Sequence, residues 1–252
     1  MPCYNAEMTL MDAIDSVKKQ TVTEWELLIA DDCSSDHSRD ILSAEAACDV
    51  RIRPLFLEKN GGAATARNAA LAAAKGRYIA FLDSDDRWKP EKLQRQLAFM
   101  RANNYAFTFS GYDYIDKAGR PIGRHIHAPK EVHYEDMLKN TVVGCLTVMI
   151  DRAHTGDFQM PPLRSRQDLA TWLALLKRGF VAYGLDENLA DYRITGSRSL
   201  SGNKWRAAQH TWNVYRQVEH LPLLRSVWYF GHYAFHAMGR RFGHRMGEGE
   251  TR

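Results

Sequence analysis

The sequence Tyr78-Ile79-Ala80-Phe81-Leu82-Asp83-Ser84-Asp85-Asp86 joins five apolar residues to three carboxylates in the next four positions. The apolar run predicts a buried strand, and the acidic residues predict a polar loop at its carboxyl end. An earlier run, residues 25–30, ends in the same way at Asp31-Asp32. In open parallel α/β sheets, ligands bind outside the carboxyl ends of the strands. Both acidic loops are therefore candidates for a ligand site.

The segments around these two strands alternate between strand and helix patterns. A further strand is expected at residues 50–57, and Pro54 favours an edge position because proline cannot donate to a neighbouring strand. Gly61-Gly62 predicts a turn. Helices are expected at residues 9–19, 39–47, 63–75 and 90–103. This order predicts an α/β fold with a mostly parallel sheet flanked by helices.

The second half of the chain is less regular. Strands are expected at residues 106–110, 143–150 and 180–185, and helices at residues 167–178, 203–220 and 222–241. Three tryptophans at helical spacings are expected in the core: Trp172, Trp205 and Trp212.

The length and composition are those of a globular protein. The chain has 252 residues, 45% of them hydrophobic and 25% charged, which suits one large domain or two small ones at ~150 residues per domain. No CxxC pair occurs among the four cysteines, so a reducing compartment is favoured: Cys3, Cys33, Cys48 and Cys145. Neither a signal peptide nor a membrane-spanning segment is expected.

The net charge of +4 lies at the end of the chain. From Lys204 onward there are eight basic and three acidic residues, whereas residues 1–203 are nearly neutral. A uniform basic coat for nucleic acid is therefore excluded. One helical stripe in this tail is apolar: Leu224, Val227, Trp228, Gly231, Phe235, Met238 and Phe242. We expect it to lie on a membrane surface, the alternative being that it packs on the catalytic domain.

Asp83 and Asp85 are spaced to act on one divalent cation. Mg²⁺ or Mn²⁺ held by one or two carboxylates takes its remaining ligands from water and substrate phosphates, so the pattern predicts a metal–diphosphate site. Three carboxylates in four residues repel one another unless a cation offsets their charge. Asp86 could instead cap the helix that begins near Pro90.

Four motifs in order resemble those of the inverting, nucleotide-sugar-dependent glycosyltransferases of family two, which have the GT-A fold. They are Pro2-Cys3-Tyr4-Asn5, residues 29–36, residues 60–68 and residues 81–86. A later segment, residues 164–172, is similar to the family's catalytic-base region. The resemblance covers about residues 1–195. It implies a catalytic domain over 1–195 and a helical, basic, amphipathic extension over 196–252.

The resemblance also implies a role for individual residues. Pro2, Tyr4 and Asn5 would lie in the nucleotide-binding loop. Asp32 or Asp31 would accept a hydrogen bond from the base, which favours uracil; Asp31 is the weaker candidate, because an adjacent pair usually divides into one ligand-facing and one structural residue. The remaining nucleotide-side candidates are Gly62, where the backbone can approach closely, Arg67 and Asp83. Asp85 would hold Mg²⁺ or Mn²⁺, which neutralises charge on the departing diphosphate.

Inversion requires a base for the acceptor hydroxyl, and Asp168 is the candidate. An acidic residue often precedes this base in the family, but Gln167 stands here, and Asp157 is the fallback. Arg193, Arg198 and Ser199 follow the last expected strand and could clamp a phosphate or form a plain surface loop.

The expected reaction is transfer of a hexose from a UDP-sugar to a glycan or lipid-linked acceptor, in cell-envelope polysaccharide synthesis. The enzyme is expected in the cytoplasm, at the inner face of the plasma membrane. Family members carry an apolar strand before the Pro-x-Tyr-Asn motif, so a start upstream of Met1 is also expected. Two alternatives stay open: a haloacid-dehalogenase-type phosphatase using Asp83 and Asp85, and a non-catalytic nucleotide-binding scaffold.

Overall fold

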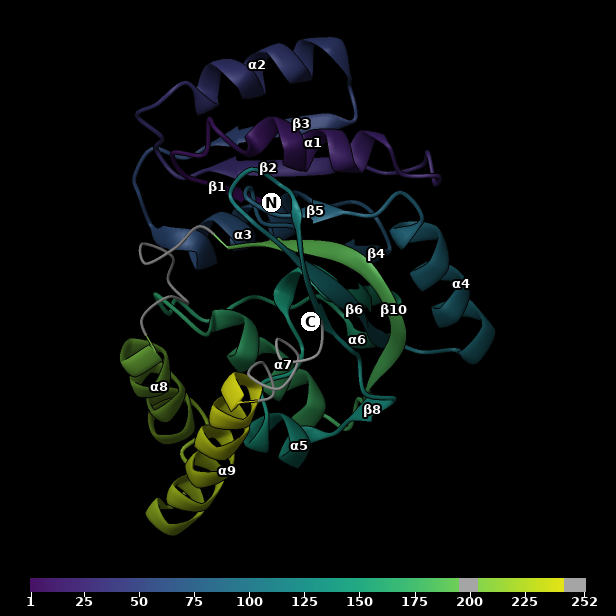
Figure 1. The fold of residues 1–252 in the computed structure, drawn as a ribbon. Helices are drawn as coiled ribbons and strands as arrows, with labels where there is room; N and C mark the ends of the chain where they lie inside the picture. Colours follow the sequence, from purple (N-terminus) through teal and green to yellow (C-terminus); the bar gives the residue numbers. More distant parts are fainter. Residues whose placement is uncertain (195–203, 243–252) are drawn as a thin grey trace, which may run out of the picture.

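The computed structural model describes residues 1–194 and 204–242. Its strands form two sheets with helices packed on their faces (Figure 1). The expected α/β class is confirmed. The expectation of one mostly parallel sheet is wrong, because the larger sheet is mixed and mainly antiparallel.

The smaller sheet is wholly parallel and has the order β1–β2–β3, formed by Pro2–Cys3, Leu27–Asp31 and Ile52–Phe56. Strand β2 is buried along its whole length, as a central parallel strand should be. Leu27 and Ile29 face α1 and α2, whereas Leu28 and Ala30 face α3. These helices span Leu10–Lys18, Ser38–Cys48 and Gly62–Ala73. The edge position predicted from Pro54 is confirmed, since β3 pairs with β2 alone.

The larger sheet has the order β4–β9–β6–β10–β5, formed by Tyr78–Ala80, Met149–Asp151, Phe107–Ile115, Ala182–Arg193 and Arg87–Trp88. Strand β7 (Pro121–Ile126) pairs with β6, and β8 (Glu131–Val132) pairs with β10. The long, curved β10 crosses the molecule and reaches well beyond the predicted strand (Figure 1). Only the end of the strand predicted at 143–150 forms, as β9, because Cys145–Thr147 adopt a 3₁₀ turn.

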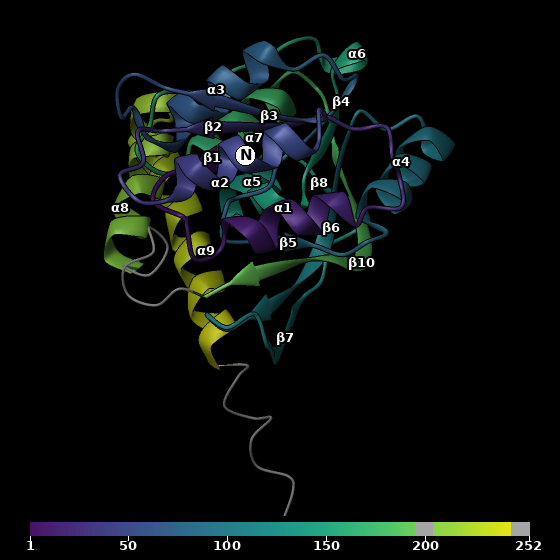
Figure 2. The same cartoon turned by 90° about the horizontal axis from the view of Figure 1, so that it is seen from above.

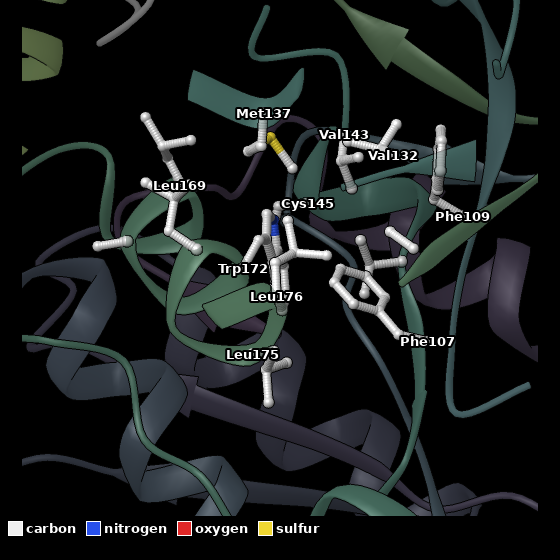
Figure 3. Close-up of a cluster of buried hydrophobic side chains, with 14 of the residues drawn as sticks. Phe107, Phe109, Val132, Met137, Val143, Cys145, Leu169, Trp172, Leu175 and Leu176 are labelled. Carbon is white, nitrogen blue, oxygen red and sulfur yellow. The ribbon is translucent and has the colours of Figure 1, made fainter. Parts of the chain in front are cut away.

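Helix α7 (Gln167–Lys177) packs on one face of the larger sheet together with α5 (Tyr134–Lys139). Figure 3 shows its Trp172 inside a cluster of apolar side chains. The Trp172 ring lies 5.5 Å from Phe81 and 5.4 Å from Phe107, between ring centroids. Helix α4 (Lys92–Asn103) covers the other face, and the short α6 (Arg152–Thr155) follows β9. This packing fixes the amino end of α7, where Asp168 lies.

The C-terminal segment consists of α8 (Lys204–Asn213), a π-helical turn (Val214–Val218) and α9 (Leu223–Phe242), with α8 and α9 side by side (Figures 1 and 2). Helix α9 buries Ser226, Tyr229 and Tyr233. Its opposite side exposes a group of apolar residues, 55–85% accessible: Leu223, Leu224, Val227, Trp228 and Phe235. The helix therefore packs on the domain through one face and leaves the predicted stripe free. The side chains of Met238 and Phe242 lie outside the described part.

The structure also bears on the tryptophan predictions and on the length and polarity of the helices. Trp172 is a core residue as predicted, but the core prediction for Trp205 is wrong, since that side chain is 88% exposed on α8. Within residues 1–194 and 204–242, every helix is too short or too polar to cross a bilayer.

A cavity of about 1130 Å³ lies between the two sheets, with β2 and β4 among its walls. Strand β1 has only two residues and pairs with β2 alone, so in the described residues no backbone ladder joins the sheets. The amino group of Met1 lies beside this cavity and donates to the carbonyl of Leu28 at 2.8 Å. Burial lowers the pKa of that amino group to about 5.

Candidate active site

A second pocket, of about 800 Å³, collects most of the predicted site residues. It opens where β1 and the loops after β2 and β4 approach the amino end of α7. Eight of the candidates line it: Pro2, Tyr4, Asn5, Asp32, Arg67, Asp83, Asp85 and Asp168. Asp31 and Gly62 are outside the lining. Segments up to 166 residues apart in sequence therefore meet at one opening.

The loop after β1 forms the first wall of this pocket. Asn5 has a positive φ of 49°, and hydrogen bonds hold both its backbone amide and its side chain. Its amide donates to Ser34 Oγ at 2.9 Å, and its Oδ1 accepts from the Ser35 amide at 2.8 Å. These bonds tie the loop to the segment after β2. Tyr4 is left 54% exposed at the mouth, with an aromatic face open to a ligand.

The adjacent carboxylates Asp31 and Asp32 have different surroundings. Asp31 is fully buried and pairs with Arg39 Nε at 2.6 Å, so it stabilises the loop after β2 from inside the protein. Asp32 accepts the amides of Gly61 and Gly62 through its two oxygens, each at 2.7 Å. Gly62 has a φ of +82° and begins α3, so Asp32 binds the positive amino end of that helix. Asp32 is the one that faces the pocket.

Arg67 and Asp83 form a pair on the pocket wall. Arg67, on α3, is 6% exposed and donates through Nη2 to Asp83 Oδ1. Burial acts to lower the pKa of Arg67, but the charges of Asp83 and Asp168 are among those that raise it above its ordinary value overall. A buried guanidinium thus lies between the acidic loop and the end of α7. Its Nε is buried and has no partner among the described residues.

The acidic loop after β4 is supported by Arg193, at the end of β10. Arg193 is 3% exposed, its amide donates to Asp86 Oδ1 at 2.8 Å, and its Nε donates to the carbonyl of Asp85 at 2.7 Å. Both expectations for this residue are corrected: it is not in a surface loop, and its donors are engaged by protein acceptors. Arg198 and Ser199 lie outside the described residues. The capping alternative for Asp86 is also wrong, because α4 begins at Lys92 and Asp86 is buried under β10.

The carboxylates of this loop fit a divalent cation. Burial, and after it the charge of Asp83, raise the pKa of Asp85 to about 6. A cation would remove this repulsion, and the oxygen donors are those that Mg²⁺ and Mn²⁺ prefer. Across the described ranges no cluster of three or more His, Cys, Asp or Glu side chains is placed to hold a metal.

Asp168 lies in the first turn of α7, half-buried at the pocket edge. Arg166 precedes the helix in the left-handed region, with φ 64°, and Gln167 is buried with its Oε1 unpartnered among described residues. The fallback base Asp157 is not brought to this pocket. It pairs weakly with Arg152 at 3.5 Å and is almost fully exposed.

Tyr112 and Tyr192 also line the pocket, and sequence reasoning missed both. Their rings lie 6.0 Å apart in a cluster with Tyr114. The alternation of aromatic residues in 112–114 could have suggested Tyr112, and no comparable pattern surrounds Tyr192. A pocket with an open tyrosine, a buried arginine, a carboxylate pair and a separate carboxylate on a helix end has the groups needed for a nucleoside diphosphate and a nucleophilic hydroxyl.

Comparison with known proteins decides the family. The model for "Glycosyl transferase family 2" matches residues 1–156, which contain all of these pocket residues except Ser165, Arg166 and those of α7, β10 and α8. The chain belongs to glycosyltransferase family 2. The phosphatase alternative is thereby excluded, and the glycosyltransferase expected from the motifs is confirmed.

Two relatives of this glycosyltransferase are themselves named as glycosyltransferases. It is 52% identical over 240 residues to TuaG of Bacillus subtilis, a glycosyltransferase named for teichuronic acid biosynthesis, covering 95% of each chain. It is 40% identical to WfgD of Escherichia coli over 92% of this chain and 90% of that protein. WfgD is named as a UDP-Glc:α-D-GlcNAc-diphosphoundecaprenol β-1,3-glucosyltransferase.

Solved structures support the fold of this glycosyltransferase. Staphylococcus aureus TarS residues 1–349, in complex with UDP-GlcNAc, matches with a TM-score of 0.67 at 22% identity, over 86% of this chain and 65% of that one. The mannosyltransferase PcManGT from Pyrobaculum calidifontis, in complex with GDP-Man and Mn²⁺, matches with a TM-score of 0.65 at 16% identity, over 91% of this chain and 68% of that one.

Proposed function

We propose that this glycosyltransferase moves a hexose from a UDP-sugar to a saccharide linked through diphosphate to a polyprenol lipid, with inversion at the anomeric carbon. The observation that carries the proposal is the single pocket in which Tyr4, Asp32, Arg67, Asp85 and Asp168 meet. The names of TuaG and WfgD support the envelope setting, and that of WfgD supports the UDP donor and lipid-linked acceptor.

The nucleotide would occupy the wall formed by the β1 loop and the segment after β2. Pro2 and Tyr4 offer apolar and aromatic surface to the base. The carboxylate of Asp32 has lone pairs beyond those used by the two glycine amides, so it can accept the imide N–H of uracil. Asp31 supports this wall through Arg39, and Asn5 and Gly62 shape its backbone.

The diphosphate would lie beside the acidic loop. Asp85 would hold Mg²⁺ or Mn²⁺, and when bound this cation offsets negative charge on the departing diphosphate. Arg67 remains paired with Asp83 and adds a fixed positive charge at the pocket wall. Asp83 is then oriented toward the ribose side by its guanidinium partner. Arg193 fixes the backbone that presents Asp85.

Asp168 would accept the proton of the acceptor hydroxyl. As this oxygen forms a bond to the anomeric carbon, the bond from that carbon to the diphosphate oxygen breaks, and UDP leaves with the electron pair. The carboxylate is half-exposed, so the proton it receives can pass to solvent. Its neighbour Gln167 is neutral and adds no repulsion to the carboxylate.

The exposed face of α9 would lie on the inner, cytoplasmic face of the plasma membrane, where a lipid-linked acceptor is found. Leu224, Val227 and Trp228 are solvent-exposed on one side of the helix, and Arg225 is exposed beside them. Apolar residues flanked by cations favour anionic headgroups. The opposite face of α9 is anchored through buried tyrosines, so the lipid contact leaves the fold intact.

The proposal is tested with UDP-glucose and a synthetic GlcNAc-diphosphate-lipid acceptor, reading UDP release and the anomeric configuration of the product by NMR. Wild type should release UDP with acceptor present, and Asp168→Asn should lower kcat by about 10²–10⁴-fold with UDP affinity unchanged. Asp157→Asn is the matched control and should behave as wild type. A fully active Asp168→Asn enzyme contradicts the role of this residue. Absence of UDP binding with Mn²⁺ favours the non-catalytic scaffold.

A further inference from the structure

The turn that carries Asp168 is held in an unfavourable backbone conformation. Arg166 is the residue before α7, and its φ of 64° is one that side-chain-bearing residues adopt at a cost. Its carbonyl accepts the first helical hydrogen bond, from the Ala170 amide at 3.0 Å. Such a turn persists only when its surroundings hold it. What holds Arg166 therefore also sets where Gln167 and Asp168 point.

The C-terminal segment supplies the contacts of Arg166. Its Nη2 donates to the Tyr233 hydroxyl, on α9, at 3.1 Å, and its guanidinium carbon lies 6.0 Å from the centre of that ring. Tyr233 is 7% exposed, so the contact is shielded from water. Burial raises the pKa of Tyr215, in the π-helical turn, and the nearby Arg166 charge acts against that rise.

The same segment also grips the other end of α7. Lys177, the last residue of the helix, pairs with Glu219 at 3.2 Å, and Glu219 accepts from the Tyr134 hydroxyl at 2.6 Å. Glu219 follows the π-helical turn directly. Helix α7 is therefore tied at both ends to residues 214–233. Among the described contacts of that segment, the one with Arg166 is the contact that reaches the turn beside the pocket.

We propose that Tyr233 is a positioning residue for the transfer reaction: through Arg166 it fixes the turn before α7 and so the position of Asp168. The inference rests on the proposed role of Asp168 as base. It assigns to α9 a second task on the face opposite its exposed stripe. Tyr233 itself is outside the pocket lining and acts only through its neighbour.

The test compares Tyr233→Phe with Tyr229→Phe. Tyr229 lies one turn earlier on α9, is equally buried, and sits beside Glu135 rather than Arg166. Tyr233→Phe should lower kcat by about 10-fold and leave the KM for UDP-glucose within twofold, because a displaced base slows the reaction without weakening donor binding. Tyr229→Phe should leave both constants unchanged. Equal effects of the two variants, or a parallel loss of donor affinity and kcat, overturn the proposal.

A second variant separates positioning from general stability. Arg166→Gly relieves the left-handed strain and removes the contact with Tyr233, so its kcat should fall about as far as that of Tyr233→Phe. The double variant should lose no more than either single one, since both changes break one interaction. Losses that multiply in the double variant contradict the coupling.

Hydrogen exchange of residues 165–170, read by mass spectrometry without substrate, gives a measurement that is independent of activity. Tyr233→Phe should speed exchange there, whereas Tyr229→Phe should not, and unchanged exchange in Tyr233→Phe overturns the proposal. If wild type transfers no sugar, or if Asp168→Asn stays active, the proposed function is wrong whatever the Tyr233 variants show. If wild type is active and Tyr233→Phe matches it, only the present inference fails.

Discussion

Replacing Asp32 by Asn should show how strongly one carboxylate stabilises the donor wall. Asp32 is 3% exposed and accepts the amides of Gly61 and Gly62 at 2.7 Å each. A hydrogen bond to a charged acceptor contributes about 1.5–3 kcal/mol. Asn keeps one carbonyl oxygen, but its NH₂ group then faces the other amide donor. It also removes a negative charge from the amino end of α3. We expect the free energy of unfolding to fall by about 3 kcal/mol.

The assay is equilibrium unfolding in urea at pH 7, together with calorimetric titration of UDP in the presence of Mn²⁺. Asp40→Asn is the control, because Asp40 is also in the first turn of a helix but its side chain is 81% exposed. It should change stability by less than about 0.5 kcal/mol. A loss below about 1 kcal/mol for Asp32→Asn would refute the inference that the two hydrogen bonds of Asp32 to the Gly61 and Gly62 amides stabilise the fold. A full stability loss with unchanged UDP affinity in the folded protein would instead remove Asp32 from the proposed base contact.

Three further changes test other parts of the molecule. Asp85→Asn should abolish the roughly 10-fold gain in UDP affinity that we expect from Mn²⁺ in wild type; retention of that gain in calorimetry with and without EDTA contradicts the metal role. Burial lowers the pKa of Lys92 to about 7, so the folded state holds this proton less tightly than the unfolded chain, and stability should rise with pH between about 7 and 10.5. Lys92→Met should lack this rise in urea unfolding at pH 6.5 and 9.5, and parallel curves for the two proteins would count against it. Trp228→Ser should weaken binding to phosphatidylglycerol vesicles about 10-fold in a sedimentation assay. Val50→Ser, which changes an exposed apolar residue outside α9, should leave binding unchanged. Equal binding of wild type and both variants would argue against lipid contact through α9.

The sequence was most informative where chemistry and local pattern coincide. The acidic loops after β2 and β4 could be predicted because an apolar run followed by carboxylates has few other uses. The order of the family motifs then placed Asp168 in the same site as Asp83. Hydrophobic periodicity alone could not predict that two residues 85 positions apart line one pocket. Asp32 is favoured over Asp31 as the ligand-facing residue, because adjacent carboxylates usually divide into one ligand-facing and one structural residue. The partners that separate them, Arg39 for Asp31 and the Gly61 amide for Asp32, could not be predicted from the sequence.

Other features depend on contacts that no local pattern records. The length of β10 comes from its parallel pairing with β6, and Arg193 is buried because four segments converge on it. The spacing correctly predicts that the apolar residues of α9 share one face. It does not predict that the opposite face packs inward through Tyr229 and Tyr233, because the polar hydroxyl of a tyrosine makes its burial hard to predict. The core prediction for Trp205 is wrong because helical spacing alone does not ensure that a neighbouring element covers the side chain.

The position of Arg193 has a consequence for how the molecule unfolds. Besides the acidic loop, its guanidinium donates to Asp12 on α1 at 2.7 Å and to the carbonyl of Lys117 at 2.9 Å. Helix α1 packs on β2 of the smaller sheet and against β5 of the larger one, and Arg193 ends β10 of the larger sheet. The two sheets share no backbone ladder among the described residues. One buried apolar cluster, with side chains from α1, β2, β5 and β10, spans both sheets, and Arg193 adds hydrogen bonds across the same boundary. Loss of the donor site and loss of the domain should therefore occur as one cooperative event.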